Sequence, residues 1–477
     1  MKRAAVVSRA LVLPALAMLA GCAVGPNYSR PSVPAPPQFR GAEGTGDAKS
    51  SPSTSLADTK WFDLFHDDAL KQLVETALRQ NFDLRIAAER VLQGRAQMGV
   101  IQSARLPNID ATGGFNLSRV SLVGAFPITP APGVSLDTSY TQAGFSLGWE
   151  LDVWGRVRRL NEAARAQYLA SEEGRRGVVT TLIADVTSLY FQLRELDLEL
   201  SIAQQNRKVG EDNLRLTTLR KNRGAATGLD VHQAEQLLYT ATAQIAATER
   251  AIAQTENALS LLLGESPQEI PRGKTLEQLA VPLEIPAGLP SALIDRRPDI
   301  REAEQNLIAA NAEIGVAKAA YFPQINLTGF LGGQSRALQN LFTGPARQWT
   351  GAVPAFDLPI FNAGRIRANV RLTEAQQREA LINYEKTIET AFREVSDALI
   401  GYRKTSEQRA QQEQLLKALQ ETDRLSTLRY QGGLDSYLQV LDAERNRFQG
   451  ELALAQLRQQ EVLAVVQLYR ALGGGWE

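Results

Sequence analysis

The sequence predicts a mixed fold in which a membrane β-barrel continues into a long α-helical coiled-coil barrel, with four strands and about eight helices per protomer in a tandem structural repeat. Three observations support it: long proline-free segments with helical patterns, four alternating segments of membrane-strand length, and a second half of the chain that repeats the first. Because an eight-stranded barrel barely holds its own side chains, four strands cannot enclose a passage. We therefore expect a fold that closes only as a trimer.

The N-terminus has the layout of a secretory signal. Lys2, Arg3 and Arg9 precede the apolar segment "ALVLPALAMLA", which is too short to span a bilayer, and "LAGC" ends it. This ending resembles the bacterial lipobox, although an ordinary signal peptide with an incidental cysteine is the alternative. Cys22 is the only cysteine of the chain. The resemblance implies a lipoprotein signal peptide over 1–21, N-palmitoyl and S-diacylglycerol groups on Cys22, and, because Ala23 follows, sorting to the outer membrane.

A tether and two copies of one unit follow the signal. Pro, Gly, Ser and Ala dominate the segment after Cys22, so we expect a lipidated N-terminal tether over 22–60. Further on, Gly155-Arg156 matches Gly364-Arg365 at a shift of 209 residues, and this shift persists without a gap for over a hundred residues. Such self-similarity indicates a tandem duplication. We place the first repeat at 61–285 and the second at 286–477.

Long helices fill the proline-free segments. Within the first repeat, leucine and valine recur at alternating spacings of four and three, from Leu182 to Leu200, which is a heptad seam. A helix over 157–222 would be roughly 100 Å long at 1.5 Å per residue. Glycines after each long helix turn the chain back, so each repeat is expected to contain a long antiparallel helical hairpin.

Four strand candidates lie between the helices, at 107–118, 140–152, 323–332 and 349–360, the last weakened by Pro354. Each has about the length of a tilted membrane strand. In the second strand one face is apolar and is expected to contact lipid: Phe145, Leu147, Trp149 and Leu151. The other face, with Gln142, Ser146 and Glu150, would line a water-filled lumen. A soluble sandwich with one wet face would alternate in the same way. We expect Gly155 and Gly364 to form the joint between barrel and tunnel.

Composition excludes several classes of function. Lys plus Arg equals Asp plus Glu at 52 each, so no nucleic-acid partner is expected. Only two histidines accompany the single cysteine. We therefore predict no metal site, no catalytic residues and no cofactor other than the lipid on Cys22.

A series of motifs identifies the family. The sequence resembles the TolC/OprM-like outer-membrane factors, in particular the lipoprotein (NodT-type) branch that serves resistance–nodulation–division multidrug efflux systems, and the resemblance covers essentially the whole mature chain. The motifs are "LAGCAVGPNY" (19–28), "WFDLFHDDAL" (61–70), "RRPDI" (296–300), "YFPQINL" (321–327), "FDLPIFNAGR" (356–365), "YQGGLDSYLQVLDAERNRF" (430–448) and "ALGGGW" (471–476). The resemblance implies a homotrimeric outer-membrane channel with a periplasmic adaptor protein and an inner-membrane resistance–nodulation–division pump as partners.

The resemblance also implies a periplasmic gate where the helical hairpins turn. The matching positions are Leu438, Asp442 and Arg445, which share one helix face at spacings of four and three, with Tyr430 nearby. On this face Leu438, Leu441, Phe448 and Leu452 are expected to form an apolar stripe that Arg445 interrupts. The alternative is a solvated Asp–Arg pair of little energetic value.

The expected function is that of the outer-membrane component of a tripartite efflux pump. It would be a passive duct, not an enzyme, carrying drugs and other small molecules from the periplasm to the exterior. An outer-membrane duct for type I protein secretion and a non-conducting trimeric stalk are the alternatives.

Overall fold

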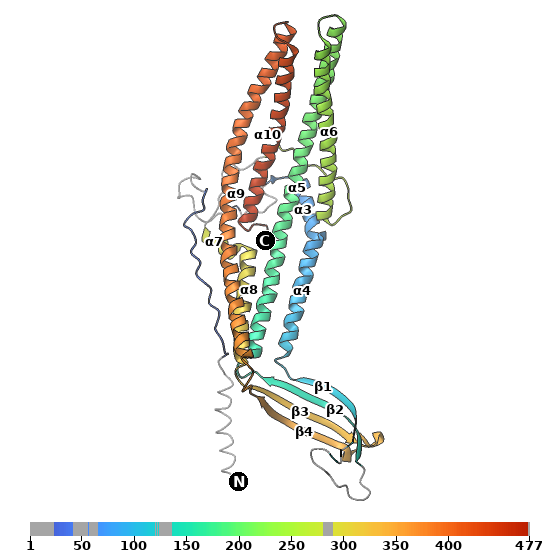
Figure 1. Ribbon diagram of the computed structural model, residues 1–477, viewed down its shortest axis with the longest axis vertical. Helices are drawn as coiled ribbons and strands as arrows, with labels where there is room; N and C mark the ends of the chain where they lie inside the picture. Colours follow the sequence, from blue (N-terminus) through green and yellow to red (C-terminus); the bar gives the residue numbers. More distant parts are fainter. Residues whose placement is uncertain are drawn as a thin grey trace. The chain divides into compact units, whose positions relative to one another are not determined.

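The computed structural model describes residues 23–41, 56, 65–119, 121, 123, 136–279 and 290–475 (Figure 1). The predicted signal peptide and Cys22 lie outside these residues. Two compact units divide the chain. The first comprises the segment up to Pro31, Val91–Ala170 and Ala303–Tyr384; the second comprises Ser32–Arg90, Ser171–Glu302 and Glu385–Glu477. Each unit therefore combines segments from both halves of the sequence.

The first unit contains a single antiparallel sheet with the strand order β1-β2-β3-β4. Its strands are β1 (Asn108–Arg119), β2 (Asp137–Leu151), β3 (Gln324–Ser335) and β4 (Arg347–Asp357). All four predicted strands exist, but β4 begins and ends earlier than the predicted 349–360. A register shift lies between Thr328 and Phe330, where three steps along β4 match two along β3. Such a bulge interrupts the period-two pattern from which the strand was predicted.

The register sorts the side chains of the sheet by polarity. Across the sheet Phe145 pairs with Ala111 and Leu331, and Leu331 pairs with Trp349, so these residues share one face. On the opposite face Ser146 pairs with Asp110 and with Phe330, so this face is mainly polar but carries one large apolar side chain. The apolar face is open: Phe145 is 59% exposed and Trp349 is 74% exposed. A sheet in water normally buries its apolar face, so this face requires a partner or an apolar solvent.

The sheet joins its helices through glycines with left-handed backbone conformations. Gly155 has φ of 79° and Gly364 has φ of 84°. Asp152, three residues before Gly155, accepts hydrogen bonds through its carboxylate from the backbone N–H groups of Val157 and Arg158, at 2.8 and 2.9 Å. These bonds satisfy free donors of the first helical turn. A strand therefore becomes a helix within a few residues.

Eight α-helices are seen in the described residues, two of them very long. In chain order they are α3 (Asp68–Gln80), α4 (Phe82–Ser103), α5 (Arg156–Asn222), α6 (Gly228–Leu263), α7 (Pro290–Arg296), α8 (Pro298–Ala319), α9 (Arg365–Gln431) and α10 (Tyr437–Ala471). The helix predicted over 157–222 is α5, displaced by one residue at its start. Among the described residues, no helix combines the length and the apolar character needed to cross a bilayer.

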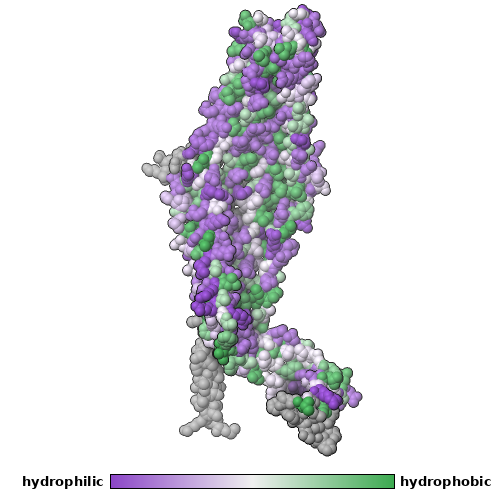
Figure 2. Space-filling model, viewed as in Figure 1, coloured by the Kyte–Doolittle hydropathy of each residue, from purple (hydrophilic) through white to green (hydrophobic). Residues whose placement is uncertain are grey.

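In the second unit the long helices form the hairpins α5–α6 and α9–α10 (Figure 1). Gly224, with φ of 76°, turns the chain after α5, whereas Gly228 opens α6 behind the Thr227 cap. The core of this unit includes Tyr190 and Leu193, both fully buried. Hydrophilic side chains predominate on the visible surface of these helices, with hydrophobic ones scattered among them (Figure 2). This is the pattern of helices that pack along narrow seams.

The segment after Cys22 is extended and fixed to the first unit. The Val24 N–H donates to the Trp154 carbonyl at 3.0 Å, and the Arg159 guanidinium donates to the Asn27 side-chain oxygen at 2.7 Å. A Cβ at Gly155 would lie 2.7 Å from Ala23 Cα, so the close approach requires glycine there. The start of the predicted tether is therefore held at the strand–helix joint.

Candidate functional site

The turn between α9 and α10 positions the predicted gate residues. Gly433, with φ of 74°, reverses the chain after α9, and the Leu434 N–H donates to the Arg429 carbonyl at 2.9 Å. The Arg429 guanidinium also donates to the Asp435 carboxylate across this turn, at 2.5 and 3.2 Å. α10 then begins at Tyr437. The turn is thus closed by local hydrogen bonds, which fix the direction in which α10 leaves it.

Leu438, Asp442 and Arg445 lie on the exposed face of the first turns of α10. Leu438 is 53% exposed. Arg445 Nη2 donates to Asp442 Oδ1 at 2.8 Å, and the Asn446 amide donates to Asp442 Oδ2 at 3.2 Å. Exposed pairs of this kind contribute little to stability. All three residues are thus exposed at the surface of the protomer.

The apolar stripe expected along this face is wrong: only Leu438 is exposed, whereas Leu441, Phe448 and Leu452 pack against other helices. Phe448 is buried and packs against Ala203 of α5 and Ile245 of α6. It therefore lies on the inner side of α10: at about 100° per residue, Phe448 is rotated about 80° around the helix from Leu438, whereas Arg445 is rotated only about 20°. Arg445 belongs to a polar exposed face and does not interrupt an apolar one.

Tyr430 lies in a different environment from the Asp442–Arg445 pair. Its ring packs at 5.3 Å from the Tyr437 ring, and the Arg220 guanidinium lies 4.4 Å from its centroid. Together with Ala234 and Val440, these aromatic residues join the α5–α6 turn to the α9–α10 turn. Tyr430 therefore connects the two hairpins and does not share the exposed face of Leu438.

Sequence reasoning missed a row of polar contacts between α5 and α10. Three α5 residues spaced by seven, Glu199, Asn206 and Asn213, each contact α10. The Gln456 amide donates to Glu199 at 3.1 Å, Arg447 Nη2 donates to Asn206 at 3.1 Å, and the Asn213 amide donates to Glu444 at 2.5 Å. These residues flank the heptad seam, where polar and charged side chains set partner choice and orientation. Their seven-residue spacing could have revealed the row.

Glu444 has an unusual environment at the gate end of this row. The side chain is buried, and its Oε2 atom has no hydrogen-bond partner among the described residues. The pKa of Glu444 is raised to about 7, chiefly by burial and secondarily by the Asp423 charge, although the Asn213 hydrogen bond and the Arg447 charge act in the opposite direction. The carboxyl therefore retains its proton well above the usual range.

The substitution Glu444→Gln is expected to remove a pH dependence of stability. In wild type the carboxyl holds a proton in the native state between about pH 4.5 and pH 7, where the unfolded chain has released it, so the free energy of unfolding falls by about 3 kcal/mol as pH rises through this window. Glutamine does not titrate. Thermal unfolding midpoints at pH 5 and pH 8 should differ less in Glu444→Gln than in the exposed control Glu249→Gln. An identical pH dependence in both variants would contradict the assignment.

Within the described part of the chain, no group of three or more His, Cys, Asp or Glu side chains could hold a metal ion. The structure instead offers an open apolar sheet face, two long helical hairpins and an exposed charged face near a hairpin turn. These features define an outer-membrane channel protein.

Comparison with known proteins places the chain in a family. The model of the outer membrane efflux protein family matches residues 73–265 and 289–474. The chain belongs to this family, which confirms the predicted family and the outer-membrane location, and the family is one of channels, not of enzymes. The chain is 38% identical over 469 residues to the solvent efflux pump outer membrane protein SrpC of Pseudomonas putida, covering 98% of each chain.

Two further comparisons concern a relative that is named as a lipoprotein and a solved channel structure. The probable outer membrane lipoprotein SilC of Salmonella typhimurium is 36% identical, with 96% of this chain and 97% of SilC covered. The open state of the MtrE outer membrane channel of Neisseria gonorrhoeae superposes with a TM-score of 0.83 and 32% identity, covering 96% of this chain and 99% of MtrE. The mixed strand-and-helix fold class predicted from the sequence is therefore confirmed.

Proposed function

We propose that this chain forms the passive outer-membrane duct of a tripartite efflux pump and carries drugs and other small molecules from the periplasm to the exterior. The observation that carries the proposal is the two-faced sheet joined directly to very long helices. One face, with Phe145, Leu331 and Trp349, suits lipid, and the other, with Asp110 and Ser146, suits water. A wall between a bilayer and an aqueous passage requires both faces.

The edges of the sheet support assembly as a homotrimer. β1 and β4 each pair with one neighbour only, so each presents a row of backbone N–H and C=O groups without strand partners in this sheet. In hydrocarbon such groups cost several kcal/mol each unless a neighbouring strand satisfies them. Three copies, joined β4 to β1, would close twelve strands into a barrel, and their long helices would form the tunnel wall.

A periplasmic adaptor protein and an inner-membrane resistance–nodulation–division pump complete the proposed assembly. Relatives that are named as outer-membrane proteins of efflux pumps support these partners. SrpC, for example, is named as the outer membrane protein of a solvent efflux pump. The balanced charge of the chain gives no reason to expect a nucleic-acid partner. A duct for type I protein secretion would share this architecture. The match to solvent, cation and antibiotic efflux proteins favours small molecules.

We assign the gate to the turns that begin α10, where Leu438, Asp442 and Arg445 present an exposed face. At the equivalent turn of α6 the alignment places Leu229, Gln233 and Gln236, so a charged constriction would come from the second hairpin only. Three copies around the axis would bring three Asp442–Arg445 pairs together. Tyr430 would act indirectly: its ring packs against Tyr437 and so would help to hold the two hairpins in contact.

Single-channel recording tests the duct directly. The purified assembly in a planar bilayer is expected to conduct in discrete steps, because the lumen-facing residues leave a polar passage. A trimer that inserts into the bilayer and never conducts would establish the stalk alternative and end this proposal.

We further propose that Cys22 carries the lipid anchor. The Val24–Trp154 hydrogen bond holds the residues after Cys22 at the strand–helix joint, so acyl chains on Cys22 would start at the level where the sheet ends. The lipoprotein name of SilC supports the same modification. Radiolabelled palmitate should enter the wild-type protein and be absent from Cys22→Ala. Label that persists in Cys22→Ala would disprove the lipidation site.

A further inference from the structure

We propose that the loop end of the apolar sheet face binds the phosphorylated, multiply acylated glycolipid of the outer leaflet, lipid A. This inference rests on the proposed function: if the helices extend into the periplasm, the end of the sheet that carries the β3–β4 loop would lie at the outer surface of the membrane. It adds a specific lipid site to a face that the duct requires only to be apolar.

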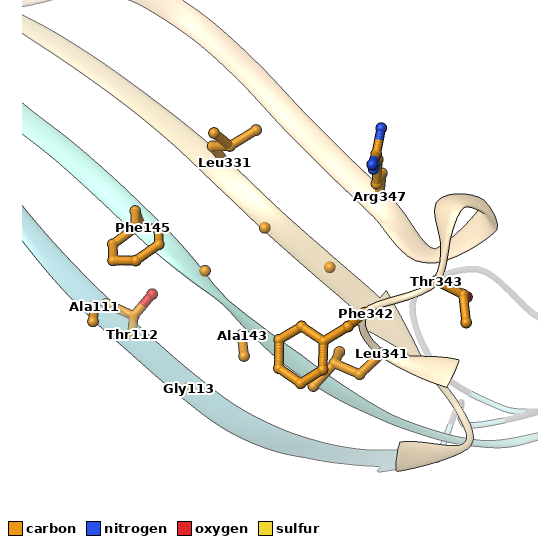
Figure 3. Close-up of a pocket in the computed structure, with 13 residues that line it drawn as sticks. Ala111, Thr112, Gly113, Ala143, Phe145, Leu331, Leu341, Phe342, Thr343 and Arg347 are labelled. Carbon is orange, nitrogen blue, oxygen red and sulfur yellow. The ribbon is translucent and has the colours of Figure 1, made fainter. Parts of the chain in front are cut away.

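The site is a groove of about 750 Å³ on the face that carries Phe145 and Leu331 (Figure 3). Small residues form its floor, namely Ala111, Gly113, Ala143 and Gly333. Phe145, Leu331 and the segment Leu341–Thr343 line its sides, and Arg347 lies at one end. These residues come from all four strands and one loop, but the floor belongs to β1, β2 and β3. Closing the sheet at its edges would therefore leave the groove open to lipid.

The loop between β3 and β4 folds back to build one wall. Its two short helical turns are η2 (Leu338–Asn340) and η3 (Gly344–Ala346). A Cβ at Gly333 would lie 2.2 Å from the Leu341 carbonyl oxygen, so only glycine permits this close approach. Leu341 is thereby buried, whereas Phe342 is 88% exposed beside the groove. An exposed aromatic side chain next to an apolar groove is typical of a surface that contacts acyl chains.

The charge at the loop end of this hairpin is positive. The β3–β4 hairpin has two arginines, Arg336 and Arg347, at its loop end, and its one acidic residue, Asp357, is the last residue of β4, at the opposite end of the hairpin. No side-chain hydrogen bond or ion pair joins Arg347 to another described residue, whereas Arg119, at the end of β1, is paired with Asp137 at 3.4 Å. An arginine at the edge of an apolar face, without an acidic partner, matches a phosphate group in the headgroup layer.

The combination of groove and charge selects the occupant. An acyl chain alone would need no guanidinium, and a free phosphate would need no apolar groove. A phosphorylated glycolipid presents both, with its phosphates at the headgroup level and its chains below. Because Arg347 pairs with Gly333 in the register, its side chain leaves the sheet on the same face as the groove floor. One ligand can therefore contact the floor and Arg347 together.

Native mass spectrometry of the purified full-length assembly tests the site. The probes are diphosphorylated lipid A, chemically dephosphorylated lipid A and phosphatidylethanolamine. We expect diphosphorylated lipid A to bind about tenfold more tightly than the other two, and Arg347→Gln combined with Arg336→Gln to abolish the difference. Arg347→Lys should retain part of it. Arg371→Gln, an arginine on α9, is the matched charge control and should change nothing.

A second pair of variants tests the groove itself. Ala143→Leu fills the floor and should reduce binding of lipid A about tenfold, whereas Gln142→Leu, on the opposite face, should leave it unchanged. Equal affinity for dephosphorylated lipid A, tighter binding of phosphatidylethanolamine, or full affinity in the double arginine variant would each overturn the site. A failure of the lipid A site can be distinguished from a failure of the proposed duct, because the conductance of the same preparations is recorded in planar bilayers. A conducting assembly without lipid A selectivity refutes only this inference.

Discussion

Replacing Asp442 and Arg445 together with alanine is expected to enlarge the resting conductance of the channel and to sensitise cells to bulky antibiotics. Both side chains are exposed, and their ion pair lies within one helix at 2.8 Å. Such a pair stabilises the protomer by less than about 1 kcal/mol, so its loss should not unfold the chain. In a trimer the three copies would narrow the passage by their size and charge. Their removal therefore widens the opening without altering the fold.

The chain provides a matched control for this experiment. Asp212 and Arg215 of α5 form an ion pair with the same spacing of three, similar exposure and a distance of 2.6 Å. Asp212→Ala with Arg215→Ala should leave single-channel conductance and antibiotic sensitivity at wild-type levels. If both double variants changed conductance equally, or if neither did, the gate assignment would be refuted.

The substitution Phe145→Arg is expected to strongly reduce the amount of assembled protein in the outer membrane. The side chain lies on the apolar face, and an arginine on the lipid face near the bilayer midplane costs about 2–4 kcal/mol. The neighbouring Ser146→Arg places the same charge on the polar face, where water would solvate it. Quantitative immunoblotting of outer-membrane fractions, with and without heating to dissociate trimers, measures the difference. Comparable losses in both variants would show that the apolar face does not contact lipid.

The sequence identified the long helices more accurately than the strands, for physical reasons. α5 begins at Arg156 because Gly155 and Asp152 provide a left-handed turn and a cap, and both are visible in the sequence. β4 was misplaced because its bulge interrupts the alternation of apolar and polar residues. Pro354 also weakened the strand pattern in the sequence. A proline is tolerated at the edge of a sheet, where its missing N–H costs no bond to a second strand in the protomer.

The candidate site was predicted in part. Leu438, Asp442 and Arg445 follow from motif resemblance and spacing, and the structure places them on one exposed face. The position of Phe448 could not be predicted from the sequence, because it lies between the exposed and the buried face of α10. Its contacts with Ala203 and Ile245, which are distant in sequence, decide that it is buried. The pairing of α5 with α10 was missed for the same reason. Tertiary contacts between helices more than 200 residues apart in sequence leave only the seven-residue spacing as a local signal.

The open edges of β1 and β4 have a genetic consequence. If closure of the trimeric barrel requires each β4 to pair with the β1 of a neighbour, one defective chain prevents closure of a trimer that also contains two intact chains. Co-expression of wild type with a chain whose β1 cannot pair should therefore lower channel activity far more than dilution alone predicts. When both chains are made in equal amounts, only about one ring in eight is free of the defective chain. Dominant-negative alleles should accordingly cluster in the two edge strands and be rare in β2 and β3.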